Sequence, residues 1–186
     1  MKILAEPLPQ LLLIEPTVFA DSRGYFMETF HSERARSIGI NDSFVQDNES
    51  HSQMGVLRGL HYQVGAHAQS KWVRVVTGSV WDVAVDLRKD SPTYGQHFGT
   101  LLSAKNKLQM YIPRGFAHGF LVMEDHSIFC YKCDNFYSRD AEAGLKYNDS
   151  QLDIPWPEIE QEYIISEKDQ RWPHWTKNIA IEVPYE

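Results

Sequence analysis

The chain has 186 residues, enough for one substantial hydrophobic core and too few for two domains of ordinary size. Its formal charge of −7 argues against nucleic-acid binding, which needs a basic surface to displace counterions. The apolar residues 11–14 are followed at once by Glu15 and Pro16, so we expect no segment that spans a membrane. The N-terminus does not resemble a signal peptide, and we expect a cytoplasmic protein.

Apolar and polar side chains alternate over much of the chain, which is typical of strands with one buried face. In residues 80–88, for example, Trp81, Val83 and Val85 share one face, while Asp82 and Ala84 share the other. In chain order, strands are expected at residues 24–30, 44–49, 56–63, 71–76, 80–88, 97–102, 107–112, 118–123 and 128–135. Short helices are expected only at residues 32–38 and near 166–169.

Turn-forming residues separate these strands, and residues 77–79 (Thr-Gly-Ser) predict a tight hairpin between two of them. Many short strands at this spacing indicate an all-β sandwich or barrel, of which the jelly roll is one form. Proline and tryptophan cluster beyond residue 154. We therefore predict a single jelly-roll domain over residues 1–186, with short peripheral helices and an irregular C-terminal strap from about residue 154.

The only cysteines are Cys130 and Cys133. No second Cys or His pair follows at zinc-finger spacing, which argues against a structural zinc site. The surrounding sequence predicts a strand, which would direct the two side chains to opposite faces. Two buried thiols are therefore a better interpretation than a redox pair.

Three segments carry side chains suited to chemistry. VLRGLHYQ (residues 56–63) holds Arg58 and His61, which need not share a strand face unless Gly59 introduces a bulge. QSKWVR (69–74) places Lys71 at the start of a strand, and IPRGFAHGF (112–120) delivers His118 into the next one.

The P-x-G-x-x-H pattern that ends at His118 resembles the second motif of the cupin superfamily. Metal-binding cupins usually supply H-x-H from their first motif, whereas the matching stretch here reads His61-Tyr62-Gln63. A three-ligand facial site is then hard to assemble, so we expect the barrel to be used without metal. Weak metal binding by His61 and His118 is the alternative.

A histidine and a lysine at the mouth of a β-barrel suit proton abstraction next to a ketone. Neutral imidazole takes up a proton near neutral pH, and an ammonium group stabilises the enolate oxygen that forms. A tyrosine on the opposite side could return a proton to the other face and so invert the carbon.

Several motifs occur together in one order: DSRGYFME (21–28), FVQDN (44–48), VLRGLHYQ (56–63), WDVAVDLR (81–88), SPTYGQ (91–96), IPRGFAHGF (112–120), YKC (131–133) and SEKD (166–169). This ordered set, from about Glu15 to Asp169, resembles the dTDP-4-dehydrorhamnose 3,5-epimerase family. The resemblance implies a cupin-like jelly-roll homodimer that uses no cofactor. It also implies epimerisation of dTDP-4-dehydro-6-deoxy-D-glucose at C3 and C5, a step of dTDP-L-rhamnose synthesis.

The same resemblance assigns roles to individual residues. His61 matches the proton acceptor, supported by Asp169, while Tyr131 matches the proton donor and Lys71 the lysine near the sugar C4 oxygen. Tyr137 matches an aromatic residue that stacks on thymine. The other positions that match substrate contacts, some of them reaching in from the partner subunit, are Arg23, Glu28, Gln46, Asp47, Asn48, Arg58, His118, Glu142 and Lys168.

The chain departs from the family pattern at residues 69–72, where Gln-Ser-Lys-Trp replaces Gln-Gly-Lys-Leu, and residues 170–186 match no motif. Two other functions stay open. One is an epimerase that acts at C3 only or C5 only, or on another nucleotide-linked 4-keto sugar. The other is a metal-dependent or non-catalytic sugar-binding cupin.

Overall fold

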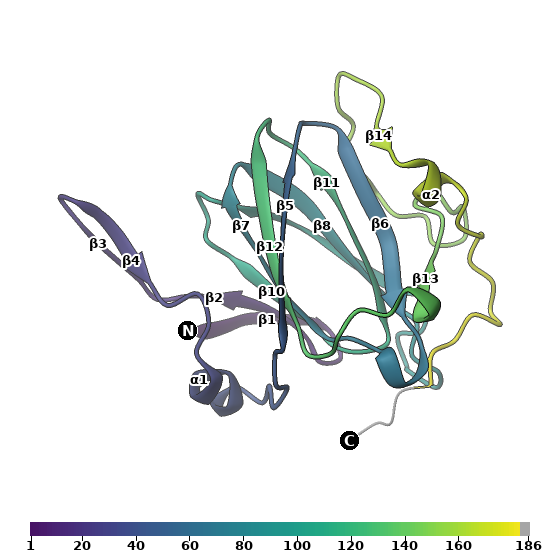
Figure 1. Ribbon diagram of the computed structural model, residues 1–186, viewed down its shortest axis with the longest axis horizontal. Helices are drawn as coiled ribbons and strands as arrows, with labels where there is room; N and C mark the ends of the chain where they lie inside the picture. The colour runs from purple at the N-terminus through teal and green to yellow at the C-terminus, as the bar shows by residue number, and fades with distance from the viewer. Residues whose placement is uncertain (183–186) are drawn as a thin grey trace.

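The computed structural model describes residues 1–182, and its strands form two facing, mainly antiparallel sheets (Figure 1). The first sheet has the strand order β1 (Lys2–Leu8), β2 (Leu11–Glu15), β10 (Gln109–Ile112), β7 (Lys71–Thr77), β12 (Ser127–Cys133) and β5 (Gln46–Ser52). The second has the order β13 (Glu142–Gly144), β6 (Val56–Gln63), β11 (Phe116–Val122), β8 (Ser79–Asp86) and β9 (His97–Ser103), and β14 (Ile164–Ile165) pairs with β6 in parallel.

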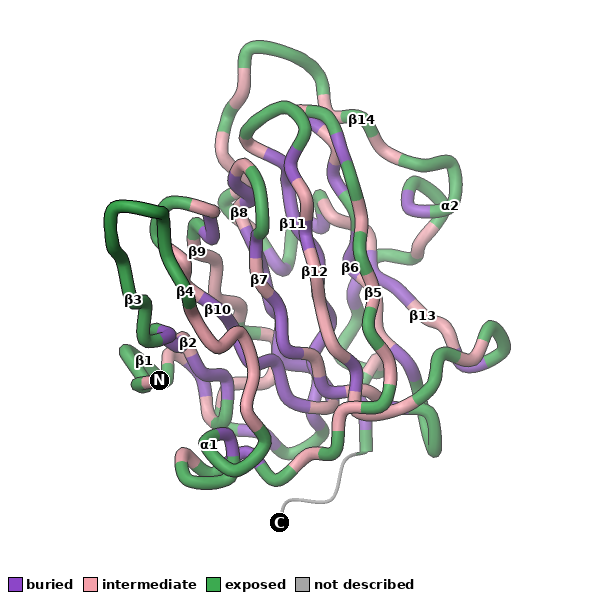
Figure 2. The backbone as a smooth tube through the Cα atoms, turned by 60° about the vertical axis from the view of Figure 1, so that its left-hand side comes forward, coloured by how far each residue is buried: buried purple, intermediate pink, exposed green. Residues whose placement is uncertain are grey.

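The main hydrophobic core lies between the two sheets, where the strands in Figure 2 are mostly buried. Val73 and Phe129 enter it from the first sheet, and Ala84 and Phe120 from the second. The rings of Phe120 and Phe129 stack with centroids 4.2 Å apart. The sheets therefore pack as a jelly roll, and the predicted all-β, cupin-like fold is confirmed.

Both predicted helices are present and short. They are α1 (Ser32–Ser37) and α2 (Glu167–Gln170), the second capped by Ser166, whose Oγ accepts a hydrogen bond from the backbone N–H of Asp169. Short 3₁₀ turns occupy Gly65–His67 and Arg139–Ala141. None of the helices in the described part of the chain has the length and apolar character needed to cross a bilayer.

The predicted hairpin between β7 and β8 is wrong. β7 pairs with β10 and β12, whereas β8 pairs with β9 and β11 in the other sheet. Gly78 has a φ of 73°, and a Cβ there would meet Ser127. The chain turns at this glycine from one sheet to the other, and a sheet-to-sheet corner has the same local residue preferences as a hairpin.

The bulge considered at Gly59 is present. His61 pairs with His118 across β6 and β11, and Arg58 pairs with Phe120, so three steps along β6 match two along β11. A Cβ at Gly59 would lie 2.5 Å from the Cα of Gly119, which leaves room only for glycine. The bulge brings Arg58 and His61 to the same inward face, which alternation alone would not do.

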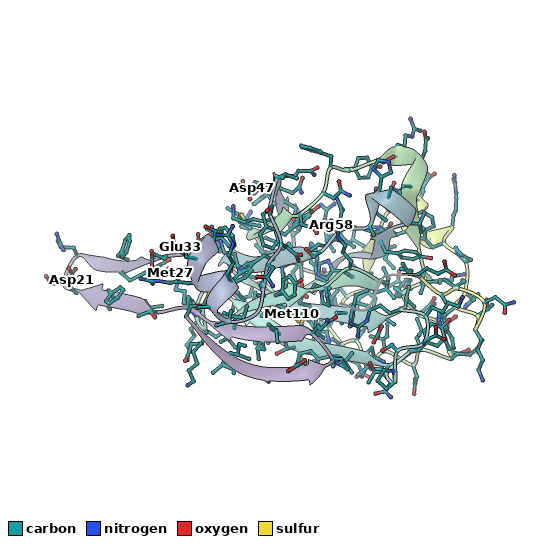
Figure 3. All side chains as sticks on the ribbon, turned by 90° about the horizontal axis from the view of Figure 1, so that it is seen from below. Asp21, Met27, Glu33, Asp47, Arg58 and Met110 are labelled. Atoms are coloured by element: carbon teal, nitrogen blue, oxygen red, sulfur yellow. The ribbon has the colours of Figure 1, made fainter. Side chains whose placement is uncertain are left out.

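A hairpin of β3 (Val18–Asp21) and β4 (Gly24–Met27) projects away from the two sheets as an arm (Figure 1). Its aromatic side chains are largely in solvent, with Phe19 59% and Phe26 65% exposed. Figure 3 shows Asp21 at the tip of this arm, far from Arg58 in the body of the protein.

The two cysteines point to opposite sides of β12, as predicted. Cys133 is buried and faces inward, whereas Cys130 is half-buried and lies beside Glu49 on the outer side. The interpretation as two buried thiols is therefore wrong for Cys130, because the outer face of this strand is only partly covered.

Candidate active site

A cavity of about 660 Å³ opens between the two sheets and is continuous in its lining with a second one of about 240 Å³. Both are lined by Asn48, His61, Lys71 and Tyr131, so we describe them together as the central cavity. These side chains come from β5, β6, β7 and β12 respectively. The fold thus brings residues from four separate stretches of sequence to one place.

His61 and Asp169 form a close pair at the wall of this cavity. Nε2 of His61 lies 2.6 Å from Oδ1 of Asp169, which α2 holds beside β6 (Figure 1). A carboxylate only accepts, so Nε2–H donates and the lone pair of the neutral ring lies on Nδ1. The His61 side chain is 31% exposed and that of Asp169 only 6%. The pair therefore combines an accessible base, His61, with a buried carboxylate that accepts its hydrogen bond.

The charge on Asp169 is well supported. Burial, the largest single influence, raises the pKa of Asp169, but the hydrogen bonds from His61, Gly59 and Trp172, together with the charge of His61, outweigh it and hold that pKa below its usual value. The backbone N–H of Gly59 also donates to Oδ2, at 3.4 Å. Asp169 thus stays ionised and can stabilise an imidazolium at His61.

A second His–Asp pair lies directly beside the first. His118, the cross-strand partner of His61, has Nε2 at 3.0 and 3.1 Å from the two oxygens of Asp82. Both side chains are buried, and burial lowers the pKa of His118. Asp82, which alternation places on the strand face opposite Trp81 and Val83, is fully buried.

Lys71 of β7 and Tyr131 of β12 line the central cavity from the sheet opposite His61. Burial lowers the pKa of Lys71, and the charges of Asp82 and Glu142 oppose that shift. Burial raises the pKa of Tyr131, so its phenol keeps its proton at neutral pH. The Lys71 ammonium lies 5.9 Å from the centre of the Tyr131 ring. The Lys71 amino group and a protonated phenol thus face the His61 wall across the cavity.

Further polar side chains lie between the central cavity and the protein surface. Glu142 accepts hydrogen bonds from Tyr137, at 2.8 Å, and from Lys168, at 2.5 Å. Gln46 accepts from the backbone N–H of Tyr137 at 3.0 Å, and its amide donates to Asn48. These five predicted residues therefore form one connected set at the mouth of the cavity.

Arg58 also lines the central cavity, where its guanidinium donates to Ser52 at 3.1 Å. Three predicted contact residues lie elsewhere. Arg23 is in the arm and pairs with Asp21, and Glu28 pairs with Arg34 of α1. Asp47 is on the outer face of β5 and pairs with Lys132 at 2.7 Å. One chain alone does not bring these three residues to the cavity.

Sequence reasoning missed one side chain next to the pair. Trp172, in the stretch that matched no motif, donates from Nε1 to Oδ1 of Asp169 at 3.3 Å. The tryptophan cluster after residue 170 was a visible signal, but nothing in it pointed toward His61. Across residues 1–182, no group of three or more His, Cys, Asp and Glu side chains is arranged to hold a metal ion.

Comparison with known proteins finds one family. The family model described as dTDP-4-dehydrorhamnose 3,5-epimerase matches residues 5–177. A relative of that name from Shigella flexneri is 49% identical over 170 residues, which cover 91% of this chain and 93% of the relative.

Two solved structures are similar over nearly the whole chain. The dTDP-4-dehydrorhamnose 3,5-epimerase of Elizabethkingia anophelis is 52% identical, with a TM-score of 0.90 over 96% of this chain and 98% of that one. The dTDP-6-deoxy-D-glucose-3,5-epimerase of Legionella pneumophila, solved with dTDP-4-keto-L-rhamnose, is 43% identical, with a TM-score of 0.93 over 99% of each chain.

Fold and site together define a cupin-like isomerase that acts on carbohydrates. More specifically, the chain belongs to the dTDP-4-dehydrorhamnose 3,5-epimerase family.

Proposed function

We propose that this protein inverts C3 and C5 of dTDP-4-dehydro-6-deoxy-D-glucose by proton abstraction next to the C4 ketone, in dTDP-L-rhamnose synthesis. The observation that carries the proposal is the accessible imidazole of His61, backed by Asp169 and facing Lys71 and Tyr131 across one cavity. Family membership and the ligand of the Legionella structure support the substrate class.

The first step is removal of a carbon-bound proton by His61. Nδ1 takes the proton and the electron pair of the C–H bond moves into the enolate, while Nε2–H keeps its hydrogen bond to Asp169. The imidazolium that forms is stabilised by the Asp169 carboxylate. General-base assistance of this kind contributes about 10²–10⁴-fold to the rate.

The second requirement is stabilisation of the C4 oxygen, where negative charge develops. Lys71 supplies a cation in a water-poor place, where a fixed charge is worth more than in bulk solvent. Tyr131 then returns a proton from the opposite sheet to the other face of the carbon. Proton removal on one face and delivery on the other inverts the configuration.

The nucleotide end of the substrate fits the polar mouth of the cavity. Arg58 and Lys168 are cations that suit a diphosphate, and a guanidinium binds phosphate oxygens in a fork. Tyr137 is 50% exposed, which leaves a ring face free to stack on a base. Gln46, Asn48, His118 and Glu142 are the other predicted contacts that line the cavity, whereas the predicted contact Asp47 lies on the outer face of β5. The reaction as proposed uses no cofactor.

We also infer a homodimer in which the arm of each chain completes the site of its partner. An isolated two-stranded hairpin is marginally stable in water, and exposed aromatic residues such as Phe19 and Phe26 favour a protein surface. β5 is an edge strand that lines the central cavity, so an arm that crosses it would bring Arg23 and Glu28 of a second copy to the substrate. The cytoplasmic location expected from the sequence stays a prediction.

Proton NMR in deuterated water tests the reaction directly. The parent enzyme should incorporate solvent deuterium at both C3 and C5 of the substrate, because each inversion passes through an enolate. His126→Asn makes the same exchange as His61→Asn but in an exposed turn. It is the matched control for His61→Asn and should behave as the parent does. Labelling at one carbon alone would establish a 3-only or 5-only epimerase, and exchange that depends on a copurifying metal would favour the metal-dependent cupin.

Mixing two inactive variants tests the shared site. His61→Asn lacks the base and Arg23→Ala lacks the arm contact, so a mixed dimer holds one intact site. After random exchange of subunits, about a quarter of the parental sites should be restored at subsaturating substrate. No recovery from dimers shown by sedimentation to have exchanged, or a strictly monomeric parent, would contradict the shared site.

A further inference from the structure

Trp172 lies against the His61–Asp169 pair, two residues beyond the end of α2. The centres of the His61 and Trp172 rings are 6.3 Å apart, with an angle of 68° between the ring planes. The indole Nε1–H donates at 3.3 Å to Oδ1 of Asp169, the same oxygen that accepts from His61 at 2.6 Å. One carboxylate oxygen therefore accepts hydrogen bonds from both rings.

The sheet beside His61 has a gap that the indole fills. Gly144 of β13 is the cross-strand partner of His61, and it has no side chain. A Cβ at Gly144 would lie 2.5 to 2.6 Å from three atoms of the Trp172 ring. The glycine therefore gives the indole a fixed place at the side of the His61 strand, because any larger residue would displace it.

The backbone on the far side of Trp172 is anchored as well. The carbonyl of Pro173 accepts a hydrogen bond from the N–H of Lys146 at 2.9 Å. Oδ2 of the buried Asp149 accepts from the backbone N–H of Trp175 at 2.9 Å and from Nδ1 of His174 at 2.8 Å. Together with α2 on the near side, these bonds hold the indole in register with Asp169.

We propose that Trp172 is a positioning residue that lowers the proton affinity of the His61–Asp169 pair. A carboxylate that accepts an additional hydrogen bond is a poorer base, so Oδ1 gives less stabilisation to a proton on His61. The indole thereby favours the neutral, proton-accepting form of the imidazole. As a role in catalysis this inference rests on the proposed function, whereas its effect on proton binding does not.

Other ionisable groups also face the pair from neighbouring elements, and the test leaves all of them in place. They are Glu49 of β5, Arg58 and Tyr62 of β6, Lys71 of β7, His118 of β11 with its partner Asp82 of β8, Tyr131 and Cys133 of β12, Tyr137, Glu142 of β13 and Lys168 of α2. Lys168 also lies over the Trp172 ring, with Nζ 5.8 Å from its centre. A substitution that keeps an aromatic ring therefore isolates the N–H group.

Trp172→Phe is the variant that removes the indole N–H and retains a ring against Gly144. The matched control is Trp81→Phe on β8, because the buried N–H of Trp81 has no hydrogen-bond partner within the described residues. Trp81 also packs in a core cluster on the side of β8 away from the central cavity. Both variants replace tryptophan by phenylalanine. Only Trp172→Phe removes a hydrogen bond, the one to Asp169.

Two measurements follow proton uptake. In ¹⁵N-histidine NMR, the resonance absent from His61→Asn reports the pair, and its titration midpoint should rise by about half a pH unit in Trp172→Phe. The acidic limb of the pH profile of kcat/KM should move by the same amount. At pH values below its midpoint, kcat/KM should then be about threefold lower than in the parent. Trp81→Phe should move neither.

An unchanged or lowered midpoint in Trp172→Phe, or an equal rise in Trp81→Phe, would overturn the proposed role of Trp172. Failure of the epimerase assignment would look different. In that case the NMR midpoint would still rise, while the parent enzyme would show no exchange at the sugar carbons.

Discussion

The two His–Asp pairs on β6 and β11 share the same chemistry and differ in their access to the cavity. The His61 side chain is 31% exposed, and it is hydrogen-bonded to Asp169 of α2, which lies outside the sheets. His118 is 6% exposed on Asp82, which comes from the neighbouring strand within the same sheet. Only the first can meet a carbon-bound proton, whereas the second supplies a fixed polar group beneath it.

This difference shows that the surroundings of a histidine decide its role. The bulge at Gly59 turns His61 toward the cavity, and the helix that follows β14 supplies its carboxylate from the rim. His118 pairs with His61 beside the bulge on one side and with Ala84 in unbroken register on the other, and burial favours its neutral form. Substitutions can therefore separate the effect of the residues around His61 on catalysis from the effect of the His118–Asp82 pair on stability.

Among the substitutions that leave both His–Asp pairs intact, the largest effect is expected for Lys71→Met, which removes the cation from the cavity. Loss of one group that stabilises the developing oxyanion should lower kcat by about 10²–10³-fold. Steady-state kinetics together with dTDP binding would measure it. Lys89→Met, which breaks an exposed ion pair with Glu182, is the control. A kcat within about tenfold of the parent would exclude Lys71 from the chemical step.

Tyr131→Phe removes only the phenolic oxygen opposite His61. Turnover should fall about 10²-fold because the proton donor is lost, while the base can still form the enolate. Substrate recovered from deuterated water should therefore contain label without inversion. Tyr147→Phe, whose ring packs on Tyr163 outside the cavity, should match the parent. Undiminished inversion in Tyr131→Phe would assign the donor role to another group.

His118→Asn should act on stability. Burial lowers the pKa of His118 below the usual 6.5, so the unfolded chain binds the proton more tightly than the folded one does. The stability from the neutral form is complete above pH 6.5 and is lost as the pH falls below it. The parent should therefore lose about 1 kcal/mol of unfolding free energy between pH 7 and 5 that the variant does not.

Urea unfolding at several pH values would measure this difference, with the exposed His126→Asn as control. If the pH slope of His118→Asn equals that of the parent, the free energy does not come from His118.

Much of the site was accessible from sequence because its parts lie in compact motifs. Residues 56–63 contain both Arg58 and His61, and the possibility of a bulge at Gly59 followed from glycine within a strand. The all-β fold followed from alternation, because buried strand faces leave a period of two in the sequence.

The features that sequence did not supply depend on contacts between distant segments. Whether Gly78 ends a hairpin or a sheet-to-sheet corner is decided by the pairing of β7 with β10 and β12, far away in the chain. The place of Trp172 depends on Gly144, and the burial of Asp82 depends on His118. None of these pairs has a local pattern that links its two members.

The central claim is that His61 removes the proton, and solvent-deuterium exchange with His61→Asn tests it most directly. Incorporation at C3 and C5 should slow by about 10²–10⁴-fold relative to the parent, while dTDP binds with unchanged affinity. Exchange at the parental rate in a folded, dTDP-binding His61→Asn protein would contradict the account.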